Sequence, residues 1–185
     1  WHRARATPGP GEEVDTELER SAGRAQARGG VAASAAFLQR AVALTVDPAR
    51  RAGRALAAAQ ASCQAGEFDA ALGLLATAEA YPLDGFQSAQ AALLRGHVAL
   101  ASAYGNDAAP LLLQAARGLE PFDLELARRA YLTAWGAAIT ANHLGGAGVL
   151  LEICRAVRAL PPVPAAPHPL DLVLEGLALL TTDDR

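Results

Sequence analysis

The sequence predicts an all-α protein made of stacked helical hairpins, and three observations support this. Alanine and leucine, which favour helices, dominate a hydrophobic content of 52%, whereas aromatic residues make up only 5%. A proline follows each copy of a recurring pattern, at Pro48, Pro82, Pro121 and Pro161. The pattern is Leu-x-x-small, with the small residues 37, 38 and 38 positions apart: Leu38-x-x-Ala41, Leu75-x-x-Ala78, Leu113-x-x-Ala116 and Leu151-x-x-Cys154. Such a period, punctuated by prolines, is typical of a stack of helical hairpins.

The first half of the chain is predicted to hold two hairpins. Residues 13–28 begin with acids and end with arginines, which suits the helix dipole, and Gly29-Gly30 ends this helix. Residues 31–45 form its partner. Asp47 as N-cap and Pro48 in the first turn start a helix over 48–65, which ends at Gly66. A return helix over 68–80 ends before Pro82.

Two more hairpins are predicted in the second half, over 84–103 with 107–118 and over 123–142 with 145–159. Asn106 or Asp107 is expected to cap the second of these helices, and Asp123 the third. The domain organisation is then a tail (1–12), four hairpins (13–160), a proline-rich connector (161–169) and the first helix of a truncated repeat (170–185). The leucines of that last helix could pair two chains into a homodimer.

Composition argues against several classes of protein. A net charge of −3 and a pI near 5.8 disfavour direct contact with nucleic acid. The N-terminus lacks the basic-then-apolar pattern of a signal peptide, and two cysteines make no disulfide framework, so we expect a cytoplasmic protein. Residues 130–151 carry no charged side chain, but Asn142 to Gly146 interrupt them with turn residues, so no membrane span is expected.

No residue pattern indicates a reaction, so we expect no enzyme activity, catalytic residue, cofactor or metal. Cys63 and Cys154 are interpreted as buried packing residues rather than a redox pair. Trp135 is interpreted as core rather than as a ligand platform. Arg20, Arg24 and Arg28 form a stripe that we interpret as a solvated face with partners such as Glu17, with phosphate contact as the alternative. The four histidines lack the spacing of a metal site: His2, His97, His143 and His168.

The second hairpin resembles a tetratricopeptide repeat (TPR). Ala58-Ala59 stand where that family has Leu-Gly, followed by Gly66-x-Phe68-x-x-Ala71-Leu72, Leu75-x-x-Ala78 and Pro82. The period here is longer than the 34 residues usual in that family. The resemblance implies a TPR-like fold, in which the hairpins stack into a right-handed superhelix.

Most of the chain also resembles the central region of large ATP-binding LuxR-type transcriptional regulators of bacteria. The stretches that carry this resemblance are Glu19 to Ala25, Gly29 to Ala33, Ala36 to Ala41, Thr45 to Ala52, Gln64 to Ala71 and Asp171 to Leu180. The resemblance implies a regulatory middle domain that senses a protein partner or small-molecule inducer, flanked by an ATPase module and a helix-turn-helix. This stretch has no phosphate-binding loop of its own, since it contains no lysine.

The TPR pattern also implies a binding surface on the concave side, formed by the first helix of each hairpin. Its expected partner-binding residues are Leu56, Gln60, Gln64, Leu94, Val98, Ser102, Arg129, Leu132 and Thr140. A mixed apolar and amide surface suits a peptide or small helix. The alternative function is a stand-alone TPR-like scaffold for protein–protein interaction, unrelated to transcription.

Overall fold

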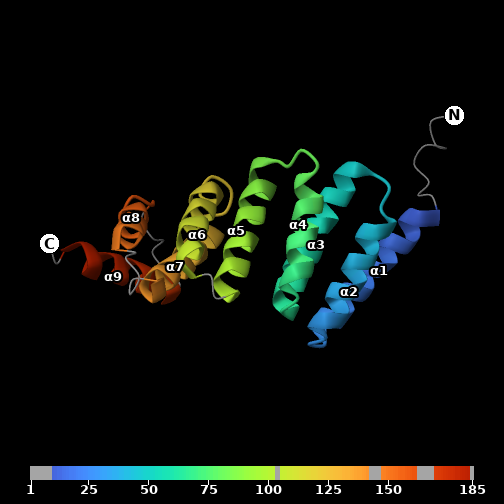
Figure 1. The fold of residues 1–185 in the computed structure, drawn as a ribbon, viewed down its shortest axis with the longest axis horizontal. Coiled ribbons are helices and arrows are strands. Elements are labelled where there is room, and N and C mark those ends of the chain that lie inside the picture. Colours follow the sequence, from blue (N-terminus) through green and yellow to red (C-terminus); the bar gives the residue numbers. More distant parts are fainter. Residues whose placement is uncertain (1–9, 103–104, 142–146, 162–168, 184–185) are drawn as a thin grey trace. The chain divides into compact units, whose positions relative to one another are not determined.

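The computed structural model describes residues 10–102, 105–141, 147–161 and 169–183. Within these ranges the chain forms nine α-helices and no strand (Figure 1), so the all-α prediction is confirmed. None of these helices is long and apolar enough to cross a membrane. Their bounds are α1 Pro10–Ala27, α2 Val31–Leu44, α3 Pro48–Ala65, α4 Phe68–Glu79, α5 Gly85–Ala101, α6 Gly105–Leu119, α7 Leu124–Ala141, α8 Ala147–Arg158 and α9 Pro169–Asp183.

The helices belong to two compact units, one ending at residue 87 and the other beginning at residue 88. In the first unit α2 packs on α1, α3 on α2 and α4 on α3. In the second unit α7 packs on α6, α8 on α7, and α9 on both α8 and α7. Consecutive helices in each unit therefore pack on each other, as hairpins require (Figure 1). A superhelix of all the hairpins together stays a prediction.

The helix ends follow from the local sequence. Asp47 caps α3 by accepting a 2.8 Å hydrogen bond from the backbone N–H of Arg50, and Asp123 caps α7 through the N–H of Leu126 at 2.9 Å. Gly66 ends α3 with a φ of 78°, a left-handed conformation that favours glycine. The expected cap of α6 was wrong: this helix begins at Gly105, so Asp107 lies in its first turn, where the helix dipole favours an acid.

The four small residues of the Leu-x-x-small pattern are all completely buried: Ala41, Ala78, Ala116 and Cys154 are 0% exposed. Leu75 and Leu113 are buried with them, whereas Leu38 and Leu151 are half-buried. The pattern therefore marks the inner face of α2, α4, α6 and α8. A side chain no larger than alanine or cysteine allows a neighbouring helix to approach closely at each of these points.

A second row of small residues, which the sequence analysis did not single out, lies on the first helix of each hairpin. Its members are 37, 37 and 38 positions apart and all buried: Ala22, Ala59, Gly96 and Ala134. A Cβ atom at Gly96 would lie 2.7 Å from Cγ and Cδ2 of Leu112 on α6, closer than carbon atoms approach. At this joint a small residue on α5 thus leaves room for a large residue on α6.

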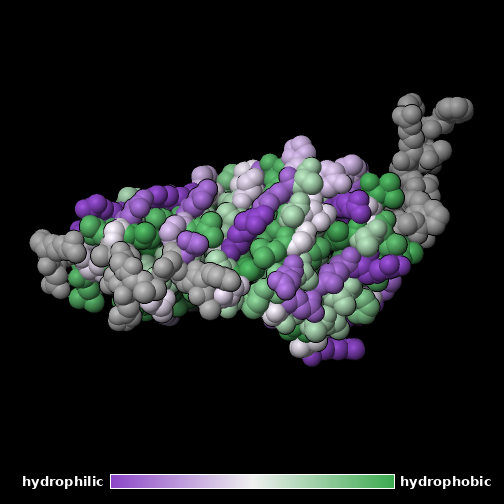
Figure 2. All heavy atoms as spheres, viewed as in Figure 1, coloured by the Kyte–Doolittle hydropathy of each residue, from purple (hydrophilic) through white to green (hydrophobic). Residues whose placement is uncertain are grey.

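The last helix, α9, is covered on one side only. Leu174 and Ala178 are buried against the helices that α9 packs on, and Leu177 is half-buried, whereas the other large apolar side chains are exposed: Leu170, Leu172, Val173, Leu179 and Leu180. On the face that Figure 2 displays, hydrophobic residues lie between hydrophilic ones along the helices, as expected for amphipathic helices.

The predicted proline-rich connector falls largely on residues 162–168, outside the described ranges.

The close contact at Gly96 predicts opposite effects for two Gly→Ala substitutions in the second unit. Gly96→Ala is expected to lower the free energy of unfolding by about 1–2 kcal/mol, because the new methyl group overlaps Leu112. Gly136→Ala, in the interior of α7 with open space around it, is expected to raise it by about 0.5–1 kcal/mol. Urea unfolding measures both. A stabilising Gly96→Ala would contradict the close packing of α5 on α6.

Candidate functional site

The predicted partner-binding residues divide into an exposed and a buried group. Gln60 and Gln64 on α3 are exposed, as are Arg129 and Thr140 on α7, and Leu132 is half-buried. Ser102 is half-buried, and its hydroxyl donates a 2.7 Å bond to the carbonyl of Val98. The buried members are Leu56, Leu94 and Val98, each less than 9% exposed. These three support the helices from inside, so a ligand would meet only the other six.

In the first unit the exposed amides lie where α1 and α3 run side by side. The Gln26 side chain on α1 donates a 3.3 Å hydrogen bond to Oε1 of Gln64 on α3. Gln60 is exposed one turn before Gln64 on the same helix. Since α1 and α3 are the first helices of consecutive hairpins, these amides occupy the kind of surface that the sequence predicts for binding. Amide side chains both donate and accept hydrogen bonds, so this surface suits a peptide backbone.

Beneath this surface, a polar network joins α1, the end of α2 and α3. Arg54, whose side chain is 10% exposed, donates from Nε to Glu19 at 2.6 Å and from Nη1 to the Thr45 hydroxyl at 2.7 Å. Thr45 is buried and donates in turn to the carbonyl of Ala41 at 2.7 Å. Because these contacts satisfy its charge, we assign Arg54 a structural role in holding the three helices together.

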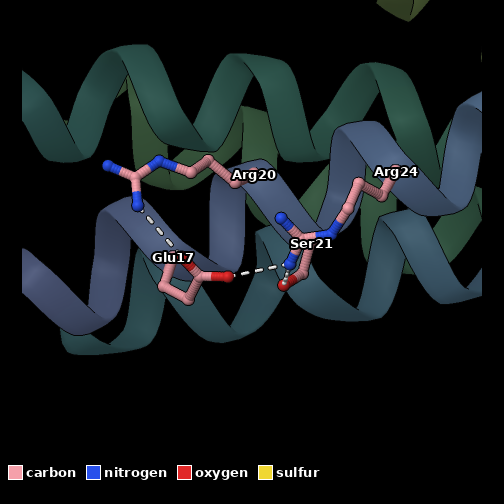
Figure 3. Close-up of polar contacts among 4 residues, drawn as sticks. All are labelled: Glu17, Arg20, Ser21 and Arg24. Carbon is pink, nitrogen blue, oxygen red and sulfur yellow. Dashed lines mark hydrogen bonds and ion pairs between the residues drawn. The ribbon is translucent and has the colours of Figure 1, made fainter.

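Two arginines of the predicted stripe, Arg20 and Arg24 on α1, are exposed and ion-paired, as the sequence predicts. Glu17 accepts hydrogen bonds from Arg24 at 2.8 Å and from Arg20 at 3.0 Å, and Arg24 also donates to the hydroxyl of Ser21 (Figure 3). The hydrogen bonds from Arg24 and then Arg20 lower the pKa of the Glu17 carboxyl below its ordinary value. Arg28 is exposed at the end of the same stripe.

In the second unit, the structure brings two of the predicted residues into one small hollow. Arg129 and Leu132 on α7 line it together with Leu170 and Asp171 on α9. The hollow has room for about 10 Å³, roughly one water molecule. Arg129 also pairs with Glu125 one turn earlier on α7. This face therefore joins the first helices of two consecutive hairpins, as Gln26 and Gln64 do in the first unit.

A larger cavity, of about 210 Å³, lies where α7, α8 and α9 meet. Arg128, whose side chain is 11% exposed, donates to the carbonyl of Pro161 at 2.8 Å, and its Nε lies 3.9 Å from Oδ1 of Asp171. Arg158 on the rim donates to the hydroxyl of Thr182 at 2.8 Å. The arginines of this cavity thus tie α9 to the preceding hairpin.

The sequence analysis missed Arg128 and selected its neighbour Arg129. Two adjacent residues on a helix point about 100° apart, so only one of them could lie on the outer face. The TPR pattern placed Arg129 there. The sequence signal for Arg128 was Asp171, an acid in the first turn of α9. The proline-rich stretch between the two residues gave no sign in the sequence that they lie close together.

The remaining chemically reactive side chains are isolated. Burial raises the pKa of the half-buried Cys63 thiol and lowers that of the half-buried His97 imidazole. Cys154 is buried, and both cysteines are free. His2, His143 and His168 lie outside the described residues, and the described residues hold no group of three potential metal ligands.

Two aromatic side chains of α7 differ in how their polar atoms are satisfied. Tyr131 is completely buried and donates its hydroxyl hydrogen bond to Glu120; burial and this bond raise the pKa of the phenol. Trp135, predicted as core, is half-buried, and its Nε1 is buried without a hydrogen-bond partner. Both side chains lie among the helices of the second unit and indicate no ligand.

Comparison of the chain with protein-family models, with curated proteins and with solved structures finds no match. Its functional interpretation therefore depends on its own residues and geometry.

The contacts of Glu17 predict an acid-shifted titration. Its carboxyl should titrate below the ordinary range for glutamate, and Arg24→Gln should move the pKa back upwards because the largest stabilising hydrogen bond is lost. NMR titration of the Glu17 side chain measures both values. Arg28→Gln, at an exposed position beyond the pair, is the matched control and should leave the titration unchanged. An unchanged pKa in Arg24→Gln would contradict the ion pairs of Figure 3.

Proposed function

We propose that this chain is a non-catalytic, signal-sensing TPR-like domain of a LuxR-type ATP-dependent transcriptional regulator. In this proposal it binds a protein partner or a small-molecule inducer and links an ATPase module to a DNA-binding module. Support comes from the sequence stretches that resemble the central region of such regulators, together with the all-helical fold. The assignment to a function, as opposed to a fold, is an analogy.

One observation favours the α1–α3 surface as the place of binding. Gln60 and Gln64 are exposed on α3, the first helix of a hairpin. The polar network of Arg54 on the same helix is already satisfied by its own hydrogen bonds. The single bond to Gln64, at 3.3 Å, is longer than the usual protein hydrogen bond, so a ligand could replace it at small cost. We therefore infer that these amides recognise backbone groups of a bound segment.

The physical route for a signal would be a change in the packing between hairpins. In the first unit each helix packs chiefly on its neighbours in sequence. A ligand that bridges α1 and α3 would bind one relative position of those helices more tightly than another. That difference in affinity would shift the two hairpins towards the packing arrangement that the ligand binds more tightly.

The test uses the parent regulator and an inducible reporter. Gln60→Ala with Gln64→Ala is expected to lower inducer-dependent transcription about tenfold, the effect of losing about 1.4 kcal/mol of binding free energy. Gln114→Ala, an exposed glutamine on the second helix of a hairpin, is the matched control and should respond normally. An unchanged response in the double variant would contradict the proposed surface. A parent chain that encodes neither an ATPase nor a helix-turn-helix would favour the stand-alone scaffold instead.

A further inference from the structure

The cavity where α7, α8 and α9 meet has a carboxylate in its wall that is not ion-paired. Glu175, exposed on α9, makes no hydrogen bond or ion pair with any residue of the described ranges. By contrast, Asp171, one turn earlier on α9, lies 3.9 Å from Nε of Arg128. The carboxylate of Glu175 is therefore available to a ligand in this cavity.

A positive charge lies in the same wall. Arg158, exposed at the end of α8, lines the cavity and donates from Nη1 to the hydroxyl of Thr182 at 2.8 Å. A guanidinium has five N–H donors, so Arg158 can keep this bond and donate to a ligand as well. Glu175 and Thr182 lie on the same side of α9, about two turns apart. Arg158 and Glu175 therefore border the same stretch of α9 from two different helices.

The size of the cavity suits a small molecule. Its volume of about 210 Å³ is that of about seven water molecules at roughly 30 Å³ each. This is below the range of about 300–1,000 Å³ that is usual for sites of drug-sized ligands. Because Glu175 and Arg158 both line so small a space, one small molecule can reach both charges.

Aliphatic side chains form much of the remaining wall. They come from the end of α8, the two described residues that follow its C-terminus region and α9: Val157, Leu160, Pro161, Leu174 and Leu179. Leu174 and Val157 are already 3% and 9% exposed, whereas Leu179 is exposed. A ligand with an apolar part would remove further apolar surface of this wall from water, which is favourable. The wall thus combines a carboxylate, a guanidinium and an aliphatic surface.

We propose that this cavity binds a free α-amino acid with an aliphatic side chain. Its ammonium group lies against the carboxylate of Glu175, its carboxylate accepts hydrogen bonds from Arg158, and its side chain packs on Leu174 and Val157. An α-amino acid carries both charges close together, as the small volume of the cavity requires. This inference does not rest on the proposed function, and it concerns a different part of the chain from the α1–α3 surface.

Simple ions fit the cavity less well than an amino acid. An inorganic anion at Arg158 would meet the negative charge of Glu175 in the same small space, and a simple cation at Glu175 would meet Arg158. Either ion would leave the aliphatic part of the wall in contact with water. The described residues also hold no group of three potential metal ligands.

The probes for the test are L-leucine and L-valine, titrated onto the full chain and followed by isothermal titration calorimetry. Binding should saturate and should raise the Tm of the chain, since the ligand binds only the folded state. Glu175→Gln and Arg158→Gln should each weaken binding about tenfold or more, because each removes a hydrogen bond between charged groups. The matched controls are Glu152→Gln and Arg155→Gln, at exposed positions of α8 outside this cavity, and both should bind as the original chain does. Circular dichroism establishes that each variant keeps its helix content.

Two analogues of leucine test the two charges without any change to the protein. Isocaproate lacks the ammonium group and isoamylamine lacks the carboxylate, so each should bind about tenfold or more weakly than L-leucine. Equally tight binding of isocaproate would indicate an anion site at Arg158, and equally tight binding of isoamylamine a cation site at Glu175.

Either of those results would overturn the proposal. So would the absence of saturable binding of both amino acids, or unchanged binding in Glu175→Gln. Because the analogues need no substitution, they decide the question even where a variant fails to fold. None of these results bears on Gln60 and Gln64, so failure here is distinguishable from failure of the proposed function.

Discussion

The packing of both units depends on close approach between helices at small residues. At each Leu-x-x-small joint the small residue is completely buried, and the row of small residues on the first helices is buried with it. The gap at Gly96, which the side chain of Leu112 fills, shows how tight one such contact is. A chain with only 5% aromatic residues has few large side chains to fill its interior, so it relies on short distances between helices instead.

The same constraint explains where polar groups are tolerated inside. The two largely buried arginines described above each reach a defined partner. Arg54 is held by Glu19 and Thr45, and Arg128 by the carbonyl of Pro161 near Asp171. Both arginines connect a first helix to a neighbouring first helix or to its connector. We interpret them as positional contacts between successive hairpins, and the exposed amides as a surface left for partners.

Local sequence was sufficient to predict the helices, because their ends are set by short-range chemistry. Asp47, Pro48 and Gly66 determine where α3 begins and ends, and the structure agrees with all three. The binding surface was harder to predict, since exposure depends on which side of a helix its neighbours cover. A shift of one residue separates Arg129 from Arg128, and Leu56, Leu94 and Val98 proved to be buried.

The central claim is that small residues are required at the joints, and one pair of substitutions in α4 tests it most directly. Ala78 is completely buried, whereas Ala76 on the same helix is exposed. Urea unfolding of the first unit should show a loss of about 1–3 kcal/mol in the free energy of unfolding for Ala78→Leu, because the added atoms force α4 away from its neighbour. Ala76→Leu should change it by less than about 0.5 kcal/mol. Equal effects of the two substitutions would contradict the account.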